Sequence, residues 1–140
     1  GHVISNKELL GQKYIIYFYP KGDTPGCTKE ACDFRDNLQQ LSTLDTKVIG
    51  VSKDSLDKHN KFISKYDLNF PLAVDEDGSV CENFGVWVEK SMYGKTYMGI
   101  ERSTFLVDSS GKILKIWRKV KVKGHIESIL EELSNLQNAA

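Results

Sequence analysis

The 140-residue sequence lacks several features that mark large classes of protein. No apolar run approaches the roughly 20 residues that a membrane-spanning helix needs. Neither sign of charge is in excess, because 19 basic and 19 acidic side chains balance, so no net field favours nucleic acid or an anionic membrane. The printed sequence also has no secretory leader, internal repeat or low-complexity tract. We therefore expect one globular domain over residues 1–140, with no nucleic-acid or membrane partner.

Cysteine is scarce too, with three residues at positions 27, 32 and 81. An odd count fits the disulfide framework of a secreted protein poorly, whereas reactive thiols fit a reducing compartment, so we expect a cytoplasmic protein. The three histidines are scattered along the chain, and no Cys/His spacing resembles a zinc site. We therefore expect no zinc site, and the sequence implies no other metal and no organic cofactor.

What the sequence does contain is a Pro/Gly-rich turn between an apolar run, residues 14–19, and a stretch with helical periodicity. Pro25 suits the first position of that helix, and Thr24 is a natural N-cap. Cys27 then falls in the first turn, where unpaired N–H groups and the helix dipole stabilise a thiolate. Cys27 is therefore either a reactive thiol or a small core residue, since it also lies on the apolar face of the helix.

A second cysteine, Cys32, follows five residues later. Helix geometry places the Cα atoms of Cys27 and Cys32 about 8.7 Å apart. This distance exceeds the limit of roughly 7 Å for a disulfide. The two residues are therefore either inert thiols or a redox pair whose reaction requires the first helical turns to unwind.

Strand-like and helix-like patterns alternate along the rest of the chain. Helices are predicted at 25–44, after a cap at Asp54 or Ser55, at 79–84 and after Gly124, and strands at 14–19, 47–52, 71–74, 103–107 and 112–120. Residues 89–99 lack a clear period and are interpreted as a connection, and a capping box at 5–8 predicts a short helix over 5–10. This order is typical of an α/β fold with a central mixed sheet flanked by helices.

Several segments together resemble one known family. The spacing Pro20-x3-Thr24-x2-Cys27 matches the active-site signature of the peroxiredoxins. TPGCTKEAC at 24–32, with FRD at 34–36, resembles the bacterioferritin comigratory protein (Q-type) subfamily, as do FGVW at 84–87, GKTY at 94–97 and RSTFLVD at 102–108. The resemblance runs from about Leu10 to the end and implies a thioredoxin-like fold. The family's N-terminal β-hairpin has no counterpart here, so we expect it to be missing.

The resemblance implies a role for each residue of the signature. Cys27 would attack the peroxide and become a sulfenic acid, which Cys32 would convert to a disulfide. The Thr24 hydroxyl would contact the peroxide, although Thr24 could be only an N-cap. Pro20 would shield the thiol, although it could be only a turn former. Arg102 falls where the family's active-site arginine falls, and it would stabilise the thiolate; without the resemblance it reads as an exposed charge at a strand start.

Further residues are expected around the substrate, namely Gly26, Glu30, Phe84 and Trp87. Glu30 lies one helical turn after Cys27. Unpaired, it would disfavour the thiolate; paired with Arg102 it would orient the guanidinium, and it is also a favourable acidic residue for a first turn. Phe84 and Trp87 could equally be core. Cys81 is interpreted as a small hydrophobic residue.

The sequence therefore predicts a thiol peroxidase that reduces hydrogen peroxide and organic hydroperoxides. Thioredoxin or a similar dithiol is the expected reductant, and a monomer is the expected state. Two alternatives stay open. A thioredoxin-like disulfide reductase would carry C-x-x-C rather than the C-x4-C present here, and a redox-switched binding or holdase protein would use the same unwinding to expose apolar surface.

Overall fold

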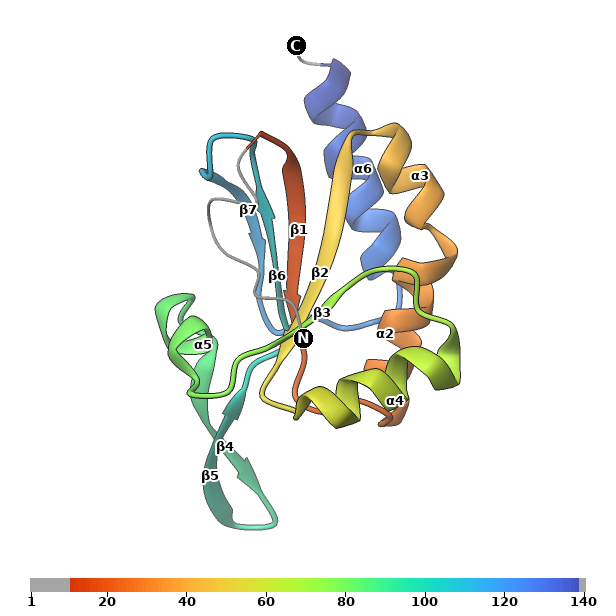
Figure 1. The fold of residues 1–140 in the computed structure, drawn as a ribbon. Coiled ribbons are helices and arrows are strands. Elements are labelled where there is room, and N and C mark those ends of the chain that lie inside the picture. Colours follow the sequence, from red (N-terminus) through yellow and green to blue (C-terminus); the bar gives the residue numbers. More distant parts are fainter. Residues whose placement is uncertain (1–10, 139–140) are drawn as a thin grey trace.

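A computed structural model describes residues 11–138 of the chain. The predicted short helix at 5–10 and the family's N-terminal hairpin therefore both concern a part of the chain outside the described residues. Figure 1 shows a central sheet with most of the helices packed against one side of it.

The sheet has five strands in the order β3-β2-β1-β6-β7. The first three strands of this order pair in parallel, whereas β6 pairs antiparallel with both β1 and β7, so the predicted mixed sheet is confirmed. The strands are β1 (Lys13–Phe18), β2 (Thr46–Ser52), β3 (Leu72–Val74), β6 (Ser103–Val107) and β7 (Ile113–Trp117). β1 occupies the centre, as its continuous apolar sequence requires for a strand that is covered on both faces.

Alternate residues of β1 enter two separate cores. Ile15 and Tyr17 belong to the cluster beneath most of the helices, and Ile16 and Phe18 belong to the cluster on the opposite face. The helices are α2 (Pro25–Asp36), α3 (Leu38–Thr43), α4 (Leu56–Tyr66), α5 (Ser79–Asn83) and α6 (His125–Asn138). Buried residues of α2, α3, α4 and α6 fill the first cluster, whereas α5 contributes to the second (Figure 1).

The single helix predicted for residues 25–44 is divided into two. α2 ends at Asp36, and Asn37, with φ −111° and ψ 9°, separates it from α3. The Asn37 side-chain amide donates to the carbonyl of Asp33 at 2.8 Å. This bond competes with the helical backbone pattern, which is why asparagine favours such a break.

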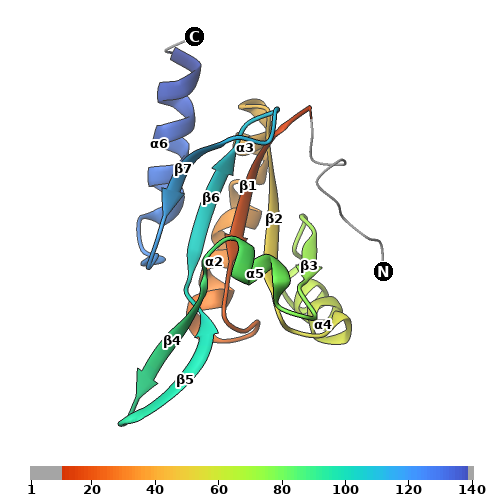
Figure 2. The same cartoon turned by 90° about the vertical axis from the view of Figure 1, so that its left-hand side faces the viewer.

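The interpretation of residues 89–99 as an irregular connection is wrong. They form most of a hairpin of β4 (Trp87–Met92) and β5 (Lys95–Ile100). Its turn places Tyr93 and Gly94 at φ 53° and 76°, as a tight hairpin turn requires. Figure 2 shows the hairpin extending away from the main sheet. Most of its side chains are exposed, so the alternation that marks a half-buried strand is absent from the sequence.

The remaining predicted elements are confirmed with small shifts at their ends. Ser55 caps α4, and its hydroxyl accepts from the backbone N–H of Lys58 at 3.2 Å. The β6–β7 hairpin and the helix after Gly124 are both present, and α5 ends shortly before Gly85.

Candidate active site

Cys27 is placed by the connection between β1 and α2. α2 begins beyond the carboxyl end of the central strand, and Cys27 is its third residue (Figure 1). Pro25 is the first helical residue and Thr24 occupies the N-cap position, as predicted. The Thr24 hydroxyl, however, donates to the carbonyl of Lys21 at 2.8 Å and does not cap the helix. Its side chain therefore shapes the turn before the helix.

The Cys27 thiol lies in the first core and meets one charged side chain. Only 2% of Cys27 is exposed. The Nη2 atom of Arg102 donates to Cys27 Sγ at 3.2 Å. Arg102 lies between β5 and β6, 75 residues away in sequence, so the sheet brings the two residues together. This contact places a permanently charged donor directly against the sulfur.

Glu30 holds the same guanidinium from the other side. Its Oε1 accepts from Arg102 Nη1 at 2.6 Å, and the carboxylate is almost completely buried. Burial raises the pKa of Glu30 to about 7, and the charge of Arg102 opposes that shift. Because Arg102 uses one nitrogen for Cys27 and another for Glu30, the carboxylate fixes the orientation of the planar fork.

Gly26 leaves the room that this arrangement needs. A Cβ atom at Gly26 would lie 3.1 Å from Arg102 Nη2, closer than ordinary van der Waals contact. A side chain at this position would therefore push the guanidinium away from the thiol.

Cys32 is half-buried in α2, and Cys27, Cys32 and Cys81 are all free thiols. Because α2 is continuous from Pro25 to Asp36, the expected separation of about 8.7 Å between Cys27 and Cys32 applies to this conformation.

The remaining predicted site residues are Pro20, which is expected to shield the thiol, and the pocket residues Phe84 and Trp87. Pro20 is exposed in the turn after β1. Phe84 and Trp87 pack against the second core, on the face of the sheet opposite Cys27, and Phe84 contacts Phe18 and Phe105. Their place in a substrate pocket stays a prediction, and these contacts give it no support.

Lys90 is a neighbour of the site that the sequence analysis missed. A Cβ atom at Gly99 would lie 3.2 Å from Lys90 Cδ, so the lysine side chain crosses the hairpin over a residue without a side chain. The pKa of Lys90 is lowered by partial burial and by the charge of Arg102, while Cys27 opposes the shift. Recognising the turn at Tyr93-Gly94 would have placed Lys90 on a strand.

In the described part of the chain, no group of three or more His, Cys, Asp or Glu side chains could hold a metal ion. No helix within residues 11–138 is long and apolar enough to cross a membrane.

A cysteine at a helix start beyond the central strand, with a guanidinium donating to its sulfur, fits the class of enzymes that work through a reactive thiol. Residues 1–116 match the AhpC/TSA family. The chain is 53% identical over 133 residues to a putative peroxiredoxin bcp of Coxiella burnetii, covering 95% of this chain and 88% of that protein. It is 49% identical to peroxiredoxin Bcp of Bacillus subtilis over 136 residues, covering 97% and 87%.

Solved structures agree with these relatives. Peroxiredoxin Q of Xanthomonas campestris superposes with a TM-score of 0.90 at 44% identity, covering 94% of this chain and 84% of that one. The chain therefore belongs to the AhpC/TSA family, as a peroxiredoxin of the bacterioferritin comigratory protein (Q-type) group. It has the thioredoxin-like fold and is a thiol-dependent peroxidase, an oxidoreductase.

Proposed function

We propose that the protein reduces hydrogen peroxide and organic hydroperoxides at Cys27, forms a disulfide with Cys32, and is recycled by thioredoxin or a similar dithiol. The observation that carries this proposal is the donation from Arg102 to Cys27 Sγ at 3.2 Å. Organic substrates are supported by a 43% identical relative, the bacterioferritin comigratory protein of Xanthomonas campestris, which is described by its alkyl peroxide reduction activity.

The first step oxidises the Cys27 sulfur by two electrons. The thiolate attacks one peroxide oxygen, an S–O bond forms and the O–O bond breaks. The departing oxygen takes the electron pair and a proton and leaves as water or an alcohol. Arg102 is positioned beside the reacting sulfur, where its donors would stabilise the negative charge that moves onto the oxygen.

The second step joins Cys27 to Cys32. The Cys32 sulfur attacks the sulfenic sulfur, an S–S bond forms, and the S–O bond breaks with release of water. This step requires the first turns of α2 to unwind, because the intact helix keeps the two sulfurs apart. A dithiol reductant then restores both thiols by thiol–disulfide exchange and is itself oxidised.

The residues around Cys27 have different proposed roles. Thr24 and Pro20 lie in the turn before α2, where the hydroxyl would contact the peroxide and the ring would limit water access. Gly26 makes room for the guanidinium and Glu30 orients it. We further propose that the protein acts as a monomer in the cytoplasm, where dithiol reductants are available.

Peroxide consumption tests the proposal directly. Turnover of hydrogen peroxide, tert-butyl hydroperoxide and cumene hydroperoxide should be followed with a thioredoxin system and, separately, with dithiothreitol. We expect turnover in both arms. Turnover with dithiothreitol alone would mean that thioredoxin is not the reductant, and none in either arm would overturn the peroxidase assignment.

Peptide mass mapping after one equivalent of peroxide tests the second step. We expect a bridge between Cys27 and Cys32. A bridge from Cys27 to Cys81, or between two chains, would show that Cys32 is not the resolving thiol.

A further inference from the structure

The segment that carries the two cysteines is tied to α4 at both of its ends. Ahead of Cys27, Asp23 accepts a hydrogen bond from the Tyr66 hydroxyl at 2.7 Å and forms an ion pair with Lys65 at 3.0 Å. After Cys32, the Nη1 atom of Arg35 donates to the backbone carbonyl of Tyr66 at 2.6 Å. One residue at the end of α4 therefore contacts both sides of the cysteine segment.

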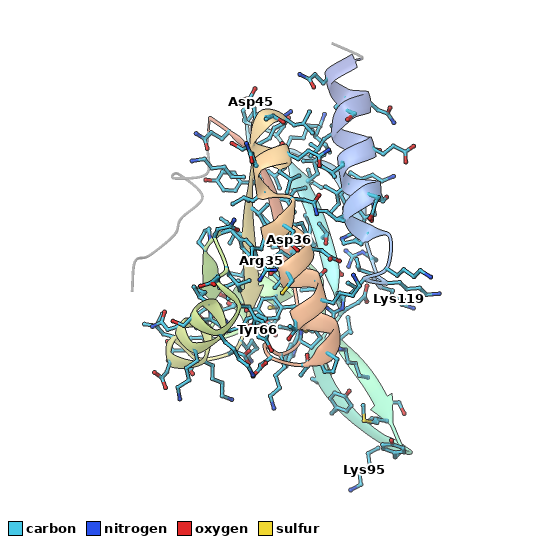
Figure 3. The ribbon with its side chains drawn as sticks, turned by 90° about the vertical axis from the view of Figure 1, so that its right-hand side faces the viewer. Arg35, Asp36, Asp45, Tyr66, Lys95 and Lys119 are labelled. Atoms are coloured by element: carbon cyan, nitrogen blue, oxygen red, sulfur yellow. The ribbon has the colours of Figure 1, made fainter. Side chains whose placement is uncertain are left out.

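The geometry of each contact has a physical reason. Tyr66 is the last residue of α4, and the final carbonyls of a helix have no partner within the helix. A guanidinium at this position satisfies such a carbonyl and complements the negative end of the helix dipole. In Figure 3, Arg35 and Tyr66 lie together between α2 and α4. Asn69, just beyond α4, adds a bond of 3.3 Å to the Arg35 carbonyl.

The contacts of Arg35 anchor the part of α2 that contains Cys32. Cys27 is buried in the core beside Arg102 and Cys32 is half-buried, so unwinding that joins them has to reach Cys32 as well as the first turn. Cys32 lies less than one helical turn before Arg35, and its displacement carries Arg35 with it. The bond between Arg35 and the Tyr66 carbonyl therefore opposes the unwinding that disulfide formation requires.

We propose that Arg35 and the end of α4 form a latch that controls the unwinding of α2, with the Arg35–Tyr66 bond as its point of release. The latch sets how long the sulfenic acid survives after the first step. A long-lived sulfenic acid meets a second peroxide and is oxidised further to a sulfinic acid, whereas rapid resolution prevents this. Arg35 is thus a positioning residue for the second step, and this inference rests on the proposed pairing of Cys27 with Cys32.

Arg35→Gln tests the latch. Rapid quenching after one equivalent of peroxide, with dimedone trapping of sulfenic acid and alkylation of free thiols, separates the two steps. We expect disulfide formation to accelerate about tenfold, the effect of losing one hydrogen bond to a charged group. The rate of sulfenic acid formation should change less than about twofold, because Arg35 does not contact Cys27. At high peroxide, the sulfinic acid formed per turnover should fall about as much as resolution accelerates.

Three further variants locate the release point. Arg35→Lys keeps a cation that can reach the carbonyl and should restore much of the slow resolution. Tyr66→Phe keeps the carbonyl but removes the bond to Asp23, and should accelerate resolution less than about threefold. Lys61→Ala removes an exposed ion pair with Asp57 on α4 and should change nothing. If Tyr66→Phe acts as strongly as Arg35→Gln, the release point is at Asp23 and the proposal is wrong.

Amide hydrogen exchange in the fully reduced protein separates the latch from the disulfide chemistry. Arg35→Gln should speed exchange across residues 28–34 about tenfold while α6 keeps its protection. If the wild type forms no Cys27–Cys32 bridge but exchange responds in this way, the resolving step fails and the latch stands. Unchanged exchange and unchanged resolution in Arg35→Gln would overturn the latch.

Discussion

Two buried cysteines occupy matching positions on opposite faces of the sheet. Cys27 is the third residue of α2 and Cys81 is the third residue of α5. Their exposed fractions are 2% and 0%. Both thiols therefore lie in the first turn of a helix and have little contact with solvent. Neither burial nor position in the helix distinguishes a reactive thiol from an inert one here.

The charge that each thiol meets does separate them. Cys81 lies beside the buried carboxylate of Asp75, which accepts a hydrogen bond from the backbone N–H of Cys81 at 2.8 Å. Burial raises the pKa of Cys81 to about 12, and Asp75 adds to the shift, so this thiol stays protonated at neutral pH. Cys27 instead accepts from Arg102, and the nearby carboxylate, Glu30, is already paired with that guanidinium.

Exchanging each cysteine for serine should give the largest contrast. Cys27→Ser should reduce peroxide turnover to the rate without protein, because a serine hydroxyl is almost never ionised near neutral pH. Cys81→Ser should leave turnover unchanged, since its hydroxyl fits the same buried site. The measurement is peroxide consumption with dithiothreitol. Substantial turnover in Cys27→Ser would remove the basis of the comparison.

Cys32→Ser should allow the first oxidation of Cys27 but block the recycling that follows it. We expect one equivalent of peroxide to be consumed, with Cys27 left as a sulfenic acid, and thioredoxin-driven turnover to be lost. Wild-type protein should lose far-UV helical signal on oxidation, whereas Cys32→Ser should keep it. Sustained thioredoxin-driven turnover in Cys32→Ser would show that another thiol resolves the intermediate.

Arg102→Ala should slow the oxidation of Cys27 about 100-fold or more, because a donor to the reacting sulfur is removed. Second-order rates over a range of pH measure this effect. Arg118→Ala is a suitable control, since Arg118 donates to the backbone carbonyls of Phe84 and Gly85 and lies over the Phe105 ring, away from the first core. An unchanged rate and pH midpoint in Arg102→Ala would mean that the contact with sulfur has no catalytic role.

Asp75→Asn should raise the reactivity of the Cys81 thiol only modestly. The amide oxygen can still accept from the helix, but the negative charge is lost, so the pKa of Cys81 should fall. Burial is the larger cause of the shift, and it persists. We expect alkylation of Cys81 by iodoacetamide at pH 8 to accelerate less than about tenfold in a Cys27→Ser, Cys32→Ser background. A larger acceleration would mean that charge alone protects this thiol.

The buried carboxylate beside Cys27 should be visible in the pH dependence of stability. The pKa of Glu30 is about 7 in the folded protein and has an ordinary value of 4.5. Between these values the folded state binds more protons, so its stability falls as pH rises and the loss is complete above about pH 7. We expect this contribution to be on the order of 3 kcal/mol.

Urea unfolding of reduced protein between pH 5 and pH 8 measures the slope. Glu30→Gln should remove the contribution of Glu30 to the slope of unfolding free energy against pH, whatever the substitution does to stability at any single pH. Equal slopes for wild type and Glu30→Gln would show that the carboxylate does not titrate in this window.

Local sequence patterns account for much of the fold. The apolar run of β1, the Pro/Gly turn and the helical period of α2 are each complete within a short stretch, and together they place Cys27 in a first helical turn. The cap of α4 could likewise be narrowed to Asp54 or Ser55 from local sequence, and the structure shows that it is Ser55. The exposed β4–β5 hairpin and the break at Asn37 escaped prediction because one lacks a buried face and the other depends on a single side-chain bond.

By itself, the sequence determined most of the strands and helices, the helix-start position of Cys27 and the family that its motifs resemble, because these depend on neighbours in the chain. Only the tertiary structure decided which charge each thiol meets. Strand pairing brings Arg102 to Cys27, and packing against the opposite face places Phe84 and Trp87 away from it. It also brings α4 against both ends of the cysteine segment. Contacts between residues far apart in the chain follow from the packing of whole elements, which no local pattern contains.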